Sequence, residues 1–252
     1  MRPAAESAAP THAPVRPAEL FDLRFRALVP EADWARLPPA VRRRFTKRLG
    51  VGESAVYAGR VVETDLTALG WMLAQGLRLV GAPLPTARIA NVPSVVAVTQ
   101  DGAGSGQIWT RLYARGSGFP QAIHSAKRFQ GPTGLEERVG AGLGMSLRVL
   151  VEDRALVFRS ERYFIDLPGF RLMLPRWLTP GILTVSHCAT GTRSFRFVLE
   201  IRHAWLGLLL RQERNSSIRS RRATTSRSRC REPQPARRAP VGRSTPQIFS
   251  RL

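Results

Sequence analysis

The sequence predicts an α+β domain in which N-terminal helices precede a strongly curved antiparallel β-sheet or open barrel, packed against one helix. Three observations support this fold class. Apolar residues recur at helical spacing in residues 37–50 and 65–80. Eight segments with strand patterns then follow one another from residue 92 to residue 203, and the turns between them are short. Seven or eight strands in one sheet tend to curl, so we expect a concave face.

Helices are expected at the N-terminal end of the domain. Residues 19–29 have the pattern of a short helix, and residues 37–50 have a clearer one, in which Val41, Phe45 and Leu49 recur every four residues. Pro39 suits the first helical turn, and Gly50 suits the position after the last. We expect a solvated outer face, rather than a contact with an anionic surface, for the basic residues Arg42, Arg43, Arg44, Lys47 and Arg48.

A strand is expected over residues 54–63, followed by a helix whose apolar stripe packs on the sheet. The stripe consists of Leu66, Leu69, Leu73, Leu77 and Val80. The remaining strands are expected at residues 92–100, 107–114, 121–130, 134–140, 145–152, 155–165, 182–189 and 195–203. The segment between the strands expected at 155–165 and 182–189 includes LMLPRWLTPG, which contains Pro175 and Pro180 and is therefore expected to be a loop. Trp177 in this loop either closes the mouth of a cavity or plugs the core.

Composition divides the chain of 252 residues into three parts: a disordered lead (1–18), one domain (19–211) and a disordered tail rich in Arg, Ser and Pro (212–252). The tail shows no apolar period, and residues 211–252 carry about half of the net charge of +21. We hypothesise that the tail is a frameshift product, because its composition is that of GC-rich DNA translated out of frame. Translating the other two frames beyond codon 211 tests this.

Charge and cysteine content narrow the function classes. The basic residues are 37 Arg and only 2 Lys, which disfavours a nucleic-acid surface even though the net charge is high. Cys188 and Cys230 give no disulfide framework and no paired metal-ligand spacing. With no signal peptide and no membrane span expected, the sequence predicts a cytoplasmic protein without a cofactor or metal.

Catalytic motifs are absent from the sequence, which assigns no catalytic residue and leaves open whether the protein is an enzyme. A ligand site is suggested instead by two predicted strands. Alternation places Trp109, Arg111 and Tyr113 on one face of the first strand. It places Glu137 on the same face of the second strand as Leu135 and Val139, and if that face is the inward one, Glu137 is an inward carboxylate. We expect Arg111 and Glu137 to meet inside the concave face. They either anchor a ligand in an otherwise apolar cavity or form a structural ion pair.

Five segments resemble, in order, the bacterial family named domain of unknown function 4166: LPPAVRRRFTKRL, IWTRLY, LEERVG, LMLPRWLTP and FRFVLEIRHAWLGLLLR. The resemblance covers residues 20–211. It implies an accessory or substrate-binding role beside a nicotinamide-dependent oxidoreductase, and it transfers no catalytic residue. Three functions are therefore weighed: binding of a small, partly apolar ligand, which we favour; an accessory domain or enzyme with an oxidoreductase partner; and a binder of anionic surfaces or nucleic acid.

Overall fold

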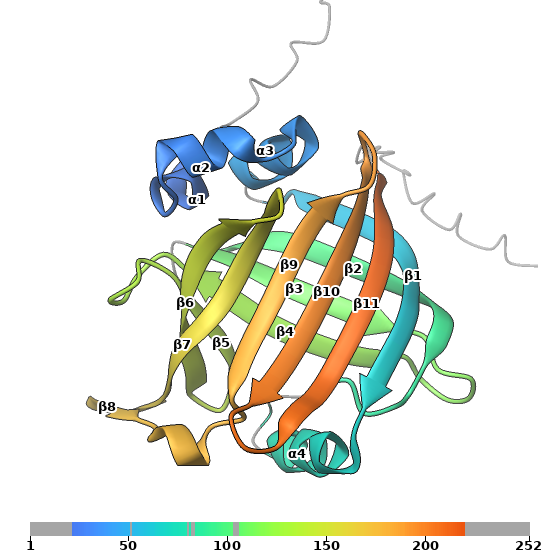
Figure 1. The fold of residues 1–252 in the computed structure, drawn as a ribbon, viewed down its shortest axis with the longest axis vertical. Coiled ribbons are helices and arrows are strands. Elements are labelled where there is room, and N and C mark those ends of the chain that lie inside the picture. Colours follow the sequence, from blue (N-terminus) through green and yellow to red (C-terminus); the bar gives the residue numbers. More distant parts are fainter. Residues whose placement is uncertain (1–21, 51, 80, 82–83, 103–105, 220–252) are drawn as a thin grey trace, which may run out of the picture. The chain divides into compact units, whose positions relative to one another are not determined.

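The computed structural model describes residues 22–50, 52–79, 81, 84–102 and 106–219, which are mostly in β-strands (Figure 1). The helices are α1 (Arg24–Ala27), α2 (Glu31–Arg36), α3 (Pro39–Thr46), α4 (Ala68–Leu79) and the 3-10 turn η1 (Arg176–Leu178). The strands are β1 (Ser54–Leu66), β2 (Ala90–Asp101), β3 (Gly106–Tyr113), β4 (Gln121–Arg128), β5 (Glu136–Gly140), β6 (Leu143–Glu152), β7 (Ala155–Leu167), β8 (Phe170–Met173), β9 (Ile182–Ala189), β10 (Ser194–His203) and β11 (Gly207–Arg219).

Ten of these strands form a closed antiparallel barrel. Hydrogen-bonded neighbours follow the order β6-β5-β4-β3-β2-β1-β11-β10-β9-β7, and the pairing of β6 with β7 closes the ring. The short strand β8 pairs with β7 outside this ring. Closure leaves no unpaired edge among the ring strands, and a barrel of this size encloses an interior.

The structure corrects two expectations. The sheet closes into a barrel and the described chain is mostly β, whereas an α+β fold with a curved sheet or open barrel was expected. A strand also continues beyond residue 212, where the tail was expected to begin. Strand β11 continues to Arg219 and pairs with both β10 and β1, in registers that include Phe197↔Arg214 and Val61↔Arg214. Residues 212–219, which were expected to be disordered, therefore form the C-terminal part of the strand that joins β1 to β10. The expected lead (1–18) and residues 220–252 of the expected tail lie outside the described residues.

Alternation along the strands is confirmed. In β10, Phe195, Phe197 and Ile201 are buried, whereas Arg196 and Arg202 are exposed. The β6–β7 connection consists of two residues, Asp153 and Arg154, whose φ angles are 46° and 60°. Positive φ at both central positions defines the tight turn whose twist matches that of the flanking strands.

Helices cover both ends of the barrel (Figure 1). At one end, Phe25 of α1 and Phe45 of α3 pack on Phe158 of β7, with ring centroids 5.9 Å and 5.7 Å apart. At the other end lies α4, which closes an end of the barrel instead of lying along the sheet. Gly70 permits this close approach, since a Cβ there would be 2.0 Å from the backbone oxygen of Leu209. Within the expected stripe, Leu69 is 47% exposed and Val80 lies outside the described residues.

Candidate functional site

The barrel encloses a cavity of about 210 Å³. A single buried water needs roughly 10–15 Å³, so the cavity has room for a small organic molecule. Most of its wall is apolar and comes from strands on all sides of the barrel. At the α4 end, the lining consists of Leu73, Leu77, Leu84, Pro85, Leu174, Leu178 and Pro180. Leu178 is also 57% exposed, so the cavity reaches the surface between α4 and η1.

All four residues predicted for the ligand site line this cavity: Trp109, Arg111 and Tyr113 of β3, and Glu137 of β5. The expected meeting of Arg111 and Glu137 is confirmed, because Arg111 Nη2 lies 3.5 Å from Glu137 Oε1. The guanidinium of Arg111 also lies over the ring of Trp109, 5.7 Å from its centroid. Whether these residues bind a ligand stays a prediction.

Lys127 of β4 is the closest partner of Glu137, and the sequence analysis missed it. Its Nζ donates to Glu137 Oε2 at 2.5 Å, and Arg111 donates to Ser125 at 2.9 Å. Burial alone would raise the pKa of Glu137, but the charges of Lys127 and Arg111, with hydrogen bonds from Lys127 and Ser125, lower this pKa to about 2. The sequence did indicate this position of Lys127, because alternation along the strand predicted at residues 121–130 puts Ile123, Ser125 and Lys127 on one face.

Arg214 of β11 also lines the cavity, although it lay in the expected tail. It is only 4% exposed, and its guanidinium lies 4.7 Å from the ring centroid of Phe197. Among the described residues, its Nη1 has no hydrogen-bond partner. Burial is the main cause that lowers the pKa of Arg214, to about 10, and the charges of Arg44 and Arg111 add to it. At neutral pH this group is therefore a buried cation.

Arg43, Lys47 and Arg48 are exposed, as expected for a solvated basic face, but Arg44 is not. Arg44 is 8% exposed and extends among aromatic rings, 3.8 Å from the centroid of Tyr57 and 4.5 Å from that of Phe197. Neither of its terminal nitrogens has a hydrogen-bond partner among the described residues. The helical spacing of the sequence indicates that Arg44 is buried, because it lies three residues from Val41 and next to Phe45, on the apolar side of the helix.

His187 of β9 lies in the cavity wall, 2% exposed, with its ring 4.7 Å from that of Phe197. Burial, followed by the charges of Arg44, Lys127 and Arg214, holds its pKa well below the usual value. The imidazole is therefore neutral at neutral pH. Its chain neighbour Cys188 points to the other face of the strand, as the alternation requires.

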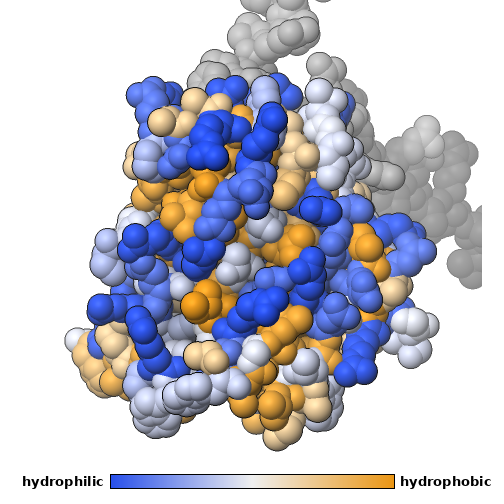
Figure 2. All heavy atoms as spheres, in the orientation of Figure 1, coloured by the Kyte–Doolittle hydropathy of each residue, from blue (hydrophilic) through white to orange (hydrophobic). Residues whose placement is uncertain are grey.

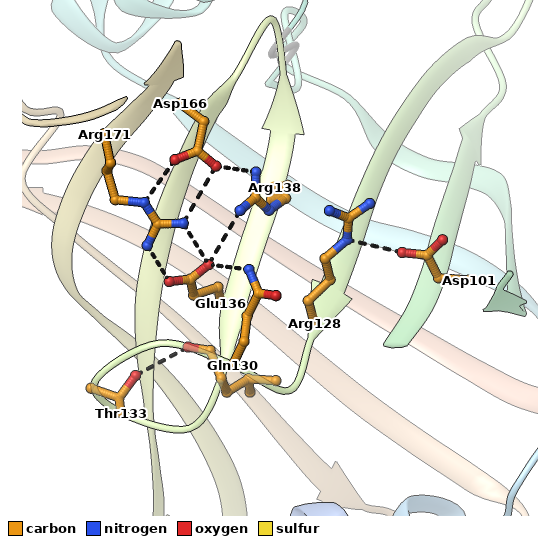
Figure 3. Close-up of polar contacts among 9 residues, drawn as sticks. Asp101, Arg128, Gln130, Thr133, Glu136, Arg138, Asp166 and Arg171 are labelled. Carbon is orange, nitrogen blue, oxygen red and sulfur yellow. Dashed lines mark hydrogen bonds and ion pairs between the residues drawn. The ribbon is translucent and has the colours of Figure 1, made fainter. Parts of the chain in front are cut away.

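A second ion cluster lies on the outer side of the wall (Figure 3). Arg171 of β8 donates to Glu136 at 2.5 Å and to Asp166 at 2.7 Å. Arg138 pairs with the same two carboxylates, and Gln130 donates to Glu136 at 2.8 Å. Hydrogen bonds from Arg171 are the main cause of the lowered pKa of Asp166. Two carboxylates and two guanidinium groups balance here, which fits a cluster that holds β8 on the barrel.

Exposed apolar side chains surround the mouth of the cavity. Figure 2 shows hydrophobic residues on the surface at the lower end of the barrel, over α4. The exposed residues at this end are Leu69, Trp71, Met72, Leu79, Phe170, Leu172, Met173, Trp177, Leu178, Ile182, Trp205 and Leu206. Trp177 is 68% exposed and so does not plug the core.

Within the described part of the chain, no three His, Cys, Asp or Glu side chains group closely enough to hold a metal ion. None of its helices has the length and apolar character needed to cross a membrane.

The fold and cavity define the class of protein: a closed antiparallel β-barrel with a charged cluster inside. A family model described as domain of unknown function (DUF4166) matches residues 37–214, well over half of the chain. The chain therefore belongs to this family, as the resemblance indicated. The match includes Gln212 and Arg214, which lie beyond the expected domain boundary. No curated protein and no solved structure matches the chain.

Proposed function

We propose that the barrel binds a small, partly apolar molecule in its interior. The observation that carries this proposal is a cavity of about 210 Å³ with an apolar wall and a few convergent polar groups, Arg111, Lys127, Glu137 and Arg214. Ligand sites in proteins commonly combine these two features. The apolar rim between α4 and η1 supports entry of the ligand at this end.

Binding of a neutral fluorescent probe, N-phenyl-1-naphthylamine, to the purified full chain tests the proposal. The probe becomes bright when it leaves water, so titration reports binding to an apolar site. A variant that fills the cavity is Leu199→Trp, because Leu199 lines the cavity wall. Its matched control is Val198→Trp, the next residue on β10, whose side chain points to the outer face.

Saturable binding that Leu199→Trp abolishes and Val198→Trp preserves is the expected result. Native mass spectrometry of the chain, released gently from its expression host, adds a second readout, since a retained ligand gives a reproducible extra mass. Equal binding by both tryptophan variants would place the probe outside the cavity and contradict the proposal.

A further inference from the structure

We propose that the ligand is an amphiphilic anion, whose oxyanion is bound by Arg214 within the field of Arg44, Arg111 and Lys127, and whose apolar part extends toward α4. This inference rests on the proposed function and adds the charge of the ligand and its orientation. The oxyanion is a carboxylate or a phosphate ester, because a guanidinium fork fits both.

The first argument is the excess of positive charge in the interior. Three cations, Arg111, Lys127 and Arg214, line the cavity together with a single carboxylate, Glu137. Arg44 adds a fourth cation, buried behind the ring of Phe197 that Arg214 also contacts. An ionised group that is buried without a counterion is strongly unfavourable. An anionic ligand would supply the missing counterion, so the loss of this unfavourable free energy would strengthen its binding.

The second argument is that Glu137 is already engaged. Its Oε2 accepts from Lys127 at 2.5 Å, and its Oε1 lies 3.5 Å from Arg111. Arg214 and Arg44 keep terminal nitrogens without a partner among the described residues. These nitrogens belong to side chains that are at least nine-tenths buried. Of these two side chains, that of Arg214 belongs to a residue that lines the cavity, so its guanidinium is the donor proposed for an incoming oxyanion.

The third argument is the separation of polar and apolar lining. Arg44 reaches the interior from α3, at the end covered by α1–α3, while apolar side chains of α4 and η1 line the opposite end. An amphiphile matches this arrangement in one orientation only, with the acidic group inside and the apolar part toward the mouth.

Two probes with the same naphthylamine frame test the inference on the purified full chain. One is the anion 1-anilinonaphthalene-8-sulfonate, and the other is neutral N-phenyl-1-naphthylamine. The variant Arg214→Gln removes the proposed donor. Its matched control is Arg211→Gln, which removes an equal charge from the outer face of the same strand, where Arg211 pairs with Glu200. Unfolding midpoints of all three chains are measured without ligand.

Arg214→Gln is expected to weaken binding of the anionic probe by about tenfold or more and to leave that of the neutral probe within about twofold. Its unfolding midpoint is expected to equal or exceed that of the parent chain, because the variant removes an uncompensated buried cation. Arg211→Gln is expected to bind both probes as the parent does. Competition by dodecanoate, dodecyl phosphate and neutral dodecanol then distinguishes a carboxylate ligand from a phosphate ester.

Three outcomes count against the inference. If Arg214→Gln binds the anionic probe as tightly as the parent, the oxyanion is not held there. If the variant unfolds at a lower temperature or fails to fold, Arg214 is a structural residue. If dodecanol competes as well as the two anions, the ligand needs no charge. In each of these cases the parent chain still binds the neutral probe, whereas failure of the proposed function removes binding of both probes to the parent chain.

Discussion

Two adjacent carboxylates of β5, Glu136 and Glu137, lie on opposite sides of the barrel wall and have opposite surroundings. On the outer side, Glu136 and Asp166 face Arg138 and Arg171, so the charges balance (Figure 3). On the inner side, Glu137 is the one carboxylate among the described residues of the cavity lining, and it pairs with Lys127 and Arg111. Arg214 also lines the cavity, and the charges acting on it are those of Arg44 and Arg111.

The difference shows which buried ion cluster points to a function. A buried ion pair alone is weak evidence, because ion pairs also serve to fix strand register. In the outer cluster the charges balance, since each carboxylate has two guanidinium partners, although Arg138 Nε has no hydrogen-bond partner among the described residues. The inner cluster keeps an excess of cations that no carboxylate among the described residues neutralises, and that excess is the observation on which the proposed anionic ligand rests.

The largest expected effect comes from removing the inner carboxylate. Glu137→Gln leaves Lys127 and Arg111 buried without a counterion, so we expect a loss of about 3–5 kcal/mol in the free energy of unfolding. The neighbouring change Glu136→Gln is expected to cost less, about 1–3 kcal/mol, because Asp166 still pairs with both arginines. Urea unfolding of the two variants measures both values.

The order of these two losses is what the comparison predicts. The double variant Glu137→Gln/Lys127→Met is expected to recover part of the loss, because it removes a cation that the first change leaves unpaired. A larger loss for Glu136→Gln, or no recovery in the double variant, would contradict the charge balance assigned to the two sides.

A smaller effect, of opposite sign, is expected at Arg44. Arg44→Met keeps the length of the side chain and removes a buried cation, so we expect the ligand-free chain to gain about 1–3 kcal/mol in the free energy of unfolding. Arg43→Met is the control, since Arg43 is exposed on the same helix. If Arg44→Met lowers stability instead, the stacking of Arg44 on Tyr57 and Phe197 outweighs its uncompensated charge.

The sequence predicted most of the barrel, because most of its strands follow the binary pattern. Alternating Phe195, Phe197 and Ile201 mark β10 without ambiguity, and the range 182–189 expected for β9 matches the observed strand. The same alternation placed Arg111 and Glu137 inside. It also predicted helices over α3 and α4, whose apolar spacing is regular.

Strand β11, which lies between β1 and β10, was missed for a physical reason connected with the candidate site. The inward residues in the second half of β11 are Gln212, Arg214 and Ser216, which are buried yet polar. Apolar periodicity does not detect such a strand segment, because its inward side chains are polar instead of apolar. Arg44 was misplaced for the same reason, although its helical spacing indicated the apolar face. In this sequence, charged residues at positions that the helix or strand pattern assigns to the buried face therefore indicate the candidate site.

The smallest expected effect is a dependence on pH that belongs to the inner side alone. Burial and the nearby cations hold the pKa of His187 well below its usual value, so the folded chain keeps this imidazole neutral. The unfolded chain binds a proton there as the pH falls through about 6.5. The unfolded state then holds more protons, so stability is lost as the pH falls, by up to about 1.4 kcal/mol per pH unit.

His187→Gln removes this proton uptake, so its free energy of unfolding should fall less steeply than that of the parent between about pH 7.5 and about pH 5.5. His203→Gln, which removes a histidine of β10 that is not among the cavity-lining residues, is the matched control. A saturating anionic ligand is expected to reduce the slope of the parent as well, because an anion beside Arg214 offsets the field that keeps His187 neutral. Equal slopes for parent and His187→Gln would mean that the histidine takes up its proton in the folded barrel, and that the inner cations exert less field than their excess implies.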